Sequence, residues 1–209
     1  MAKDTKARII TSALALFNEQ GDRDVTTNHI AKSLGISTGV LYYHFRNKEE
    51  IIRAIFQRYI DHIESTIRQP DSEQSNSDFL AQYCEEIFDS IWRYRFLHAN
   101  MPALLARDSE LQAQYLAAHQ FLQARAEAAV RWLSDHNIIC IQAQQIPILV
   151  DLMRLVTGFW VGFSQINSQQ ALNKQQVCAG IVHLIALLQP YCTASGQPIF
   201  DQLIEHYQQ

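Results

Sequence analysis

Apolar residues return every three or four positions along most of the chain, the spacing expected of helices with one buried face. In the first such segment Ile9, Ala13, Leu16 and Phe17 share one side. Gly, Pro and short polar runs separate the segments. The pattern predicts helices over about residues 6–20, 26–33, 37–44, 47–68, 79–100, 103–107, 109–136, 143–166, 174–189 and 198–207, with breaks at Pro102 and near Asp108.

The composition agrees with an all-α chain. Of 209 residues only seven are Gly and five are Pro, and 48% are hydrophobic. Few turn-forming residues favour long helices over many short strands. The chain is long enough for one larger domain, or for two smaller ones that share a core.

The segment from Thr26 to Lys48 carries the most specific local signal. Thr26 and Ser37 each stand where they can cap a short helix, and Gly35 permits a tight turn between the two helices. Ile36 is expected to fill the core beneath that turn. Two short capped helices around such a turn make a helix-turn-helix, whose first helix crosses the DNA backbone and whose second faces base edges in the major groove.

The same region resembles the N-terminal domain of the TetR family of repressors. The resemblance covers roughly the first quarter of the chain, and one departure is Leu34, where many members have Ala. A weaker resemblance, to a subset of TetR-like proteins, runs from Trp92 to Leu111. The N-terminal match rests on Phe17, Gly21, Thr26-Thr27, Ile30-Ala31, Gly35-Ile36-Ser37, Gly39, Leu41 to Phe45 and Lys48-Glu49-Glu50.

The resemblance implies DNA contacts for the outer side of this unit. By spacing, Leu41 and Phe45 lie one helical turn apart and are expected in the core. His44 alone would equally suit a helix cap or a surface group. The tyrosines at 42 and 43 could be core aromatics, but neighbours in a helix point about 100° apart, so at most one is expected to be fully buried. The implied phosphate contacts are Thr27, Tyr42, His44 and Lys48, the base contacts are Thr38, Gly39, Val40 and Tyr43, Asn28 can reach either, and the capping residues Thr26 and Ser37 complete the set.

Charge limits how such a unit can read DNA. The first 48 residues hold seven Lys or Arg against four Asp or Glu, a net charge of +3, so the remainder carries −7 of the total of −4. This distribution fits a protein that touches phosphates at one end. No Lys or Arg lies between Ser33 and His44, which removes the commonest bidentate contact to guanine. Specificity is expected from thymine methyl groups, from Asn28 or Thr38, and from DNA shape.

The helix from about 48 to 68 is expected to connect two domains. Asn47 can cap it with Glu50 three residues on, and about twenty residues would span roughly 30 Å. The predicted division is a helix-turn-helix DNA-binding domain at 1–48 and a helical effector-binding and dimerisation domain at 49–209. The expected effector pocket, whose members could instead be ordinary core residues, comprises Tyr83, Trp92, Phe96, Met101, His119 and Trp160.

The two long apolar helices near the C-terminus need a covering surface. The resemblance implies that they pair with the same helices of a second copy in a homodimer. Two copies would place their reading helices in successive major grooves of a palindromic operator, about 34–36 Å apart. The residues expected at this interface are Leu152, Phe159, Gly162, Phe163, Val177, Ile181, Leu184 and Leu188.

Several features favour the cytoplasm. The N-terminus lacks the apolar run of a signal peptide. The apolar stretch from Ile146 to Phe163 contains Asp151 and Arg154, which are costly in lipid, so it is expected to be a buried helix rather than a membrane partner. The cysteines lack paired spacing and are expected to be reduced thiols; they are Cys84, Cys140, Cys178 and Cys192.

These features predict a ligand-responsive transcriptional regulator, in the first instance a repressor, that binds a double-stranded operator and responds to a small hydrophobic or aromatic effector. No cofactor, metal or catalytic residue is predicted, because the sequence holds no nucleophile elbow, phosphate-binding glycine loop or paired His and Cys ligands. Two alternatives stay open: a small enzyme whose N-terminal motif is incidental, and a metal-responsive sensor using His98 and His119. The sequence identifies neither the effector nor the operator.

Overall fold

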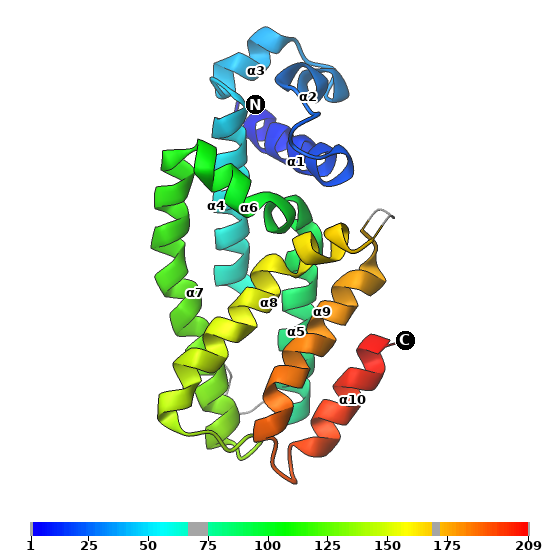
Figure 1. Cartoon of the computed structure of the whole chain (residues 1–209). Helices are drawn as coiled ribbons and strands as arrows, with labels where there is room; N and C mark the ends of the chain where they lie inside the picture. The colour runs from blue at the N-terminus through cyan, green and yellow to red at the C-terminus, as the bar shows by residue number, and fades with distance from the viewer. Residues whose placement is uncertain (1, 67–74, 169–171, 209) are drawn as a thin grey trace.

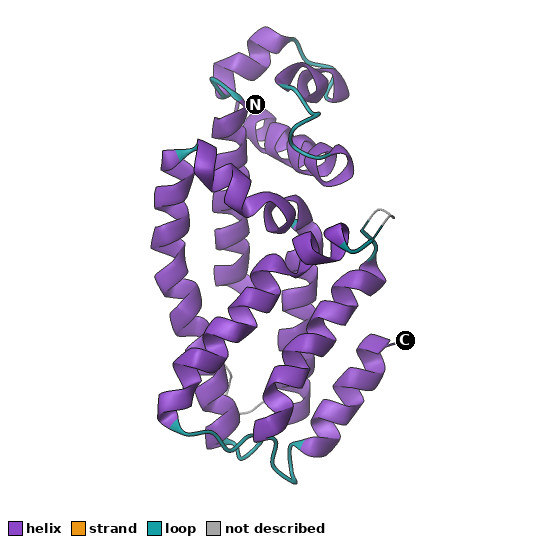
Figure 2. Ribbon diagram, viewed as in Figure 1, coloured by secondary structure: helices purple, strands orange, loops and turns teal. Residues whose placement is uncertain are grey.

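The computed structural model describes residues 2–66, 75–168 and 172–208, and this part of the chain is helical with no strand (Figure 2). Short 3-10 turns occur at Ala143–Gln145 and Gln189–Tyr191. The all-α prediction is therefore confirmed. The helices, labelled in Figure 1, are α1 Ala2–Gln20, α2 Thr27–Ser33, α3 Thr38–His44, α4 Lys48–Thr66, α5 Asn76–Arg93, α6 Arg95–Arg107, α7 Ser109–Asp135, α8 Ile146–Ile166, α9 Lys174–Leu188 and α10 Gln197–Gln208.

Most predicted boundaries agree with the structure. Asn47 caps α4 by accepting a hydrogen bond from the backbone N–H of Glu50 at 2.9 Å, and Asp108 separates α6 from α7 as expected. The helix α1 begins before Lys6. The predicted end of the connecting helix near residue 68 lies outside the described residues.

The predicted break at Pro102 is wrong. Pro102 lies on an exposed position inside α6, and the chain breaks instead at Tyr94, whose ring is fully buried. A break leaves backbone groups unpaired, and Asn18 of α1 satisfies two of them. Its side-chain amide donates to the carbonyl oxygen of Arg93 at 2.8 Å, and its carbonyl oxygen accepts from the N–H of Phe96 at 3.1 Å. A tertiary contact therefore places the break.

The helices α1 to α3 form a head at one end of the molecule, and α4 runs from it into a body made of the remaining helices (Figure 1). One hydrophobic cluster runs from the head into the body. It joins apolar residues of α1 to α3 with residues of α4, α6 and α7, and includes a pair of rings, Phe17 and Phe96, whose centroids are 5.2 Å apart. The packing is thus continuous across residue 48, where the sequence suggested a domain boundary.

A second cluster fills the far end of the body between α5, α7, α8, α9 and α10. Four residues expected at a dimer interface belong to the chain's own interior instead: Val177 and Ile181 are fully buried, and Leu184 and Leu188 are nearly so. The helix α9 packs against α5, α8 and α10. Its apolar face is covered within one chain, which corrects the expected assignment of these four residues.

The expectation that residues 146–163 form a buried helix is also wrong. A stripe of large apolar side chains on α8 is exposed to solvent, comprising Ile148, Leu152, Leu155, Phe159, Phe163 and Ile166. In the described part of the chain, Ala143–Ile166 is the one helical segment long and apolar enough to span a membrane by length and composition alone, and only 22% of its most apolar window is buried. Asp151 and Arg154 lie within it. The opposite face of α8, including Val161, packs into the body.

Candidate functional site

The turn between α2 and α3 is built by local contacts that the sequence encodes. The Thr26 hydroxyl accepts from the N–H of His29 at 3.3 Å, and the Ser37 hydroxyl accepts from the N–H of Val40 at 3.3 Å. Gly35 has a φ of +64°, a left-handed conformation that side chains disfavour. The backbone N–H of Ile36 closes the turn on the Ala31 carbonyl at 3.1 Å. These contacts confirm the two predicted caps and the turn.

The inner face of this unit is anchored in the head. Ile30 and Leu41 are fully buried, and Ala31 and Phe45 are nearly so. The prediction that Leu41 and Phe45 are core residues is confirmed. Because both short helices are held from below, their outward residues are presented on a defined surface.

The outer face of α3 is open to solvent. Tyr43 is 81% exposed and Tyr42 49%, so neither is a core residue. Thr38, Gly39 and Val40, at the start of the helix, are also exposed. In Figure 1 α3 lies at the extremity of the molecule, away from the body. The structure thus brings the predicted base-contacting residues together on one protruding surface, which we call the α3 face: Thr38, Gly39, Val40 and Tyr43.

The predicted phosphate contacts surround this face. The Thr27 and Tyr42 hydroxyls are 3.0 Å apart and hydrogen-bonded, which links α2 to α3. The Lys48 ammonium donates to the carbonyls of Asp22 and Val25 at 2.6 and 3.1 Å. An ammonium has three donors, so one N–H of Lys48 is not accounted for by these bonds. Asn28, Thr26 and Ser37 are exposed, and His44 is partly buried with its ring 5.1 Å from that of Tyr43.

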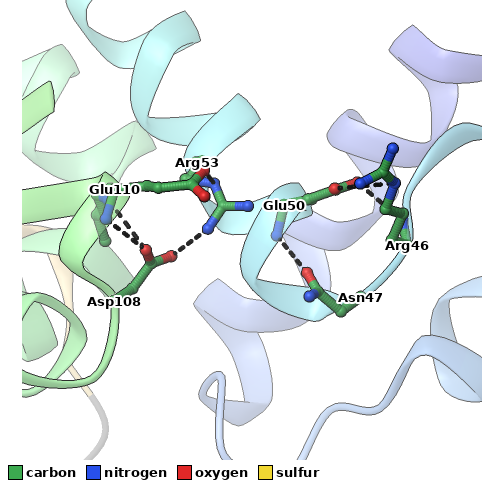
Figure 3. Close-up of polar contacts among 7 residues, drawn as sticks. Arg46, Asn47, Glu50, Arg53, Asp108 and Glu110 are labelled. Atoms are coloured by element: carbon green, nitrogen blue, oxygen red, sulfur yellow. Dashed lines mark hydrogen bonds and ion pairs between the residues drawn. The ribbon is translucent and has the colours of Figure 1, made fainter.

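Polar contacts also fasten the head to the body. The buried carboxylate of Asp22, next to the end of α1, forms an ion pair with Arg107 at the end of α6. Further along, Arg53 of α4 reaches the start of α7, where its guanidinium lies 2.8 Å from Asp108 and 3.3 Å from Glu110 (Figure 3). The helices that hold the head are therefore connected to one another by charged groups.

A cavity of about 320 Å³ lies between α4, α6, α7 and α8. A second cavity, of about 120 Å³, extends from it toward α5 and α9. Both are bordered by Tyr59, His98, Leu122, Arg154 and Thr157, so we treat them as the large and small lobes of one body cavity that meet at these five residues.

The predicted pocket residues are split by the structure. Met101 and His119 border the large lobe, and Tyr83 borders the small lobe. The other three border neither lobe, because other contacts occupy them. Phe96 packs against Phe17 in the core, the Trp92 ring contacts the cationic groups of Arg95 and Lys174, and the indole N–H of Trp160 donates to the Gln176 carbonyl at 2.6 Å.

Sequence reasoning missed Tyr59, His98 and Arg154 as residues of an effector pocket. Burial lowers the pKa of His98 to about 4, so its ring is neutral at physiological pH, and burial raises the pKa of the Tyr59 hydroxyl above its usual value. Arg154 borders the same cavity and lies within hydrogen-bond distance of Gln123 and His119. One signal was present in the sequence: an Arg inside an otherwise apolar helix marks a position with a polar task.

Within the described ranges, no group of three or more His, Cys, Asp or Glu residues is arranged to hold a metal ion. His98 and His119 both border the large lobe. His119, however, is exposed and adjoins Arg154, whereas His98 is buried. In the described ranges His119 thus contacts the cation Arg154, and no contact with a carboxylate is described for it.

Matches to known protein families cover most of the chain. Residues 9–55 match the family described as bacterial regulatory proteins, tetR family, and residues 58–200 match the TetR family described as bacterial transcriptional repressor. An HTH-type transcriptional regulator of Staphylococcus aureus (strain USA300) is 36% identical over 80 residues, which cover 38% of this chain but only 43% of that relative.

Solved structures agree. A TetR-family transcriptional regulator from Marinobacter aquaeolei VT8 is 32% identical, with a TM-score of 0.87 over 98% of this chain and 99% of that one. The SmeT–triclosan complex shares the fold at 19% identity and a TM-score of 0.60, covering 92% of this chain and 94% of that one. Family matches cover both the head and most of the body, so the chain belongs to the TetR family of helix-turn-helix transcriptional regulators.

Proposed function

We propose that the protein is a homodimeric repressor that binds a palindromic operator and is released from it by a small organic effector. The observation that carries the DNA-binding part is the α3 face, where residues of suitable chemistry stand exposed above a fixed core. A helix N-terminus with Thr38, Gly39 and Val40 at its start fits the docking of a recognition helix in the major groove.

The face would read by shape and apolar contact more than by charge. Between Ser33 and His44 there is no Lys or Arg, so base contacts come from hydroxyls, the Val40 side chain and the Tyr43 ring. Thymine methyls suit such groups. Phosphate contacts from Thr27, Tyr42 and Lys48 would fix the register, since these residues border the same surface.

Footprinting on DNA upstream of the gene and its neighbours tests this part. We expect two protected half-sites, one helical turn or a multiple of it apart. Tyr43→Ala should weaken binding, whereas Leu116→Ala, which changes an exposed apolar residue on α7, should not. Protection no different from that on unrelated DNA at low salt would refute operator binding.

The exposed stripe on α8 supports the homodimer. A row of large apolar side chains, among them Leu152, Phe159 and Phe163, is too extensive to be left in water on a stable monomer. Gly162 is partly buried on the same helix, with the Ala99 carbonyl 3.5 Å from where a Cβ would stand. A second copy presenting the same stripe would cover it by two-fold symmetry.

Sedimentation velocity tests the dimer. The double variant Leu152→Lys, Phe163→Lys places two charges on the stripe and is expected to sediment as a monomer, while Leu116→Lys alters an exposed leucine on a different helix and should leave the dimer intact. A monomeric unaltered protein at micromolar concentration would contradict the proposal. So would a double variant that still sediments as a dimer.

The cavity supports a response to an effector, because its walls include the helices that hold the head. The large lobe is bordered by Phe56 and Tyr59 of α4 and by His98 and Met101 of α6. A ligand that moves these two helices relative to α7 and α8, which form the other walls, would shift the head and weaken operator binding. The similar SmeT structure, which is a triclosan complex, shows a family fold holding a small molecule.

The direction of control has its own test. Deleting the gene while following transcription from a footprinted promoter should raise the transcript level if the protein represses. A fall in transcript would mean activation instead. Either result leaves the DNA-binding proposal standing, since footprinting decides that part.

A further inference from the structure

Most of the residues at the boundary between the two lobes of the body cavity have polar side chains. Of the five residues that border both lobes, Tyr59, His98, Arg154 and Thr157 carry polar side chains, and only Leu122 is apolar. The ends of the cavity are lined mostly by apolar residues, such as Phe56 and Leu155 in the large lobe and Ile63 and Ile91 in the small one. We call the polar boundary the waist. A ligand that spans both lobes must place a polar group there.

The guanidinium of Arg154 dominates the waist electrostatically. Its Nη1 atom donates to the Gln123 side-chain oxygen at 2.6 Å. Its two Nη atoms also lie 3.1 and 2.7 Å from Nε2 and Nδ1 of His119. A neutral imidazole has one acceptor nitrogen, so only one of these last two contacts can be a hydrogen bond.

Some N–H donors of Arg154 therefore have no described partner. A guanidinium carries five N–H groups, and the described partners, an amide oxygen and one imidazole nitrogen, are both neutral. No carboxylate forms an ion pair with Arg154 in the part of the chain that is described. A planar, fork-shaped cation with unsatisfied donors is the group that proteins use to bind a carboxylate.

A second, independent observation at the waist points to a ligand. His98 is buried, and its Nε2 atom has no hydrogen-bond partner. The backbone of Thr157 also acts on this ring, raising the pKa of His98 against the larger lowering effect of burial. Buried polar atoms are rarely left unpaired. If Nδ1 of the neutral ring carries the proton and faces the Thr157 backbone, Nε2 is a hydrogen-bond acceptor that a donor on the ligand can use.

The charges around the cavity favour an anion. The waist holds Arg154, and the one carboxylate on the described border of either lobe is Asp151 in the large lobe. Asp151 is exposed, so water screens its charge. The Tyr59 hydroxyl stays protonated because burial raises its pKa, and it offers a further neutral donor on the same wall.

We infer that the body cavity binds an apolar organic acid whose carboxylate lies against Arg154 at the waist and whose hydrocarbon or aromatic part fills the large lobe. A hydroxyl on the ligand would donate to Nε2 of His98. This inference rests on the proposed function only in taking the cavity as the effector site. It does not require that the protein bind DNA.

Calorimetric titration of the purified protein without DNA tests the inference. The titrants are decanoate and naphthalene-2-carboxylate, each compared with its neutral amide, so that a chain-like and an aromatic acid are both sampled. At least one acid is expected to bind about ten- to a hundredfold more tightly than its amide, the range for a charge-assisted hydrogen-bonded pair. Equal binding of acid and amide in both pairs, or binding of none of the four, overturns the inference.

Two variants locate the effect. Arg154→Gln should remove the preference for the acid, whereas Arg131→Gln removes an equal charge from an exposed ion pair on α7 and should preserve it. If Arg154→Gln does not fold, the acid-to-amide ratio on the unaltered protein still decides. Retention of the full preference in a folded Arg154→Gln variant would contradict the assignment.

A third comparison tests His98. We expect 3-hydroxydecanoate to bind more tightly than decanoate, and His98→Phe to abolish that difference; equal affinities for the two acids would refute a hydrogen bond to Nε2. The outcomes also separate this inference from the proposed function. Acid binding without operator binding would refute the regulator alone, and operator binding without acid binding would refute the ligand class alone.

Discussion

Replacing Arg53 with alanine should destabilise the protein far more than an ordinary surface change. The Arg53 side chain is 16% exposed and that of Asp108 is 8% exposed, and their closest atoms are 2.8 Å apart. Removing the arginine leaves a buried carboxylate without its counter-charge, which typically costs about 3–5 kcal/mol. Asp108 keeps two backbone donors, the N–H groups of Glu110 and Leu111 at 3.0 and 3.1 Å.

Those donors offset part of the loss, and we expect a decrease in unfolding free energy of about 2–4 kcal/mol. Glu110 adds little to this figure, because its side chain is 74% exposed. For a chain of this length such a loss lowers the melting temperature by roughly 5–15 °C. Urea denaturation followed by circular dichroism measures it directly.

A double-mutant cycle identifies the cause. Asp108→Asn keeps a capping side chain for α7 but removes the negative charge, so Arg53→Ala in that background should cost under about 1 kcal/mol. Arg131→Ala breaks an exposed pair with Glu127, whose atoms are 3.5 Å apart, and should cost at most about 0.5 kcal/mol. The reasoning is refuted if Arg53→Ala costs the same with Asp108 or Asn at that position, or no more than Arg131→Ala.

Three further changes have calculable outcomes. Gly196→Ala would place a Cβ 2.1 Å from the Ile138 carbonyl oxygen, so urea denaturation should show a free energy of unfolding lower by at least about 1–3 kcal/mol. At Gly158 an added Cβ meets nothing within 4 Å, so Gly158→Ala should not destabilise the fold. Burial lowers the pKa of His98 to about 4 from an unfolded value near 6.5, so between these pH values the unfolded chain binds a proton that the folded chain does not. The free energy of unfolding should therefore fall by up to roughly 3 kcal/mol as pH drops through that window. His98→Gln should lose this part of the pH dependence. In anisotropy titrations Tyr43→Ala should weaken operator binding several-fold without altering its salt dependence, because no charge is removed; a changed slope would argue against the neutral contact.

The head could be predicted almost completely because its signals are local. Thr26 and Ser37 cap helices that begin next to them, and Gly35 adopts the turn conformation for which glycine is suited. Leu41 and Phe45 follow from spacing along one short helix. None of these predictions required knowledge of what lies elsewhere in the chain.

The errors arose where distant residues decide the outcome. Tyr94 ends α5, and the carbonyl and N–H freed on either side of it are taken up by Asn18, more than seventy positions away. Spacing showed that α8 and α9 are apolar but not which face meets the chain's own interior, so Val177 and Ile181 were assigned to an interface. The waist of the cavity escaped prediction for the same reason, since its five residues come from four helices.

Three of the contacts between the head and the helices beneath it limit how it can move. Asn18 of α1 hydrogen-bonds to the backbone at the junction of α5 and α6. Asp22 forms an ion pair with Arg107 at the end of α6, and Lys48 of α4 donates to a backbone carbonyl in the loop after α1. One contact would leave the head free to turn about it, whereas contacts at several separate points, together with the shared hydrophobic cluster, restrain its motion relative to α4 and α6.

The head, α4 and α6 should therefore travel as one piece. Any change in the separation of two α3 faces then has to come from tilting this piece on the helices beneath it, and not from bending at the neck between head and body. A small tilt near the cavity is carried to α3 along the part of α4 between Tyr59 and Lys48, eleven residues apart, or about 17 Å. By that geometry a rotation of a few degrees displaces the α3 face by one or two ångströms.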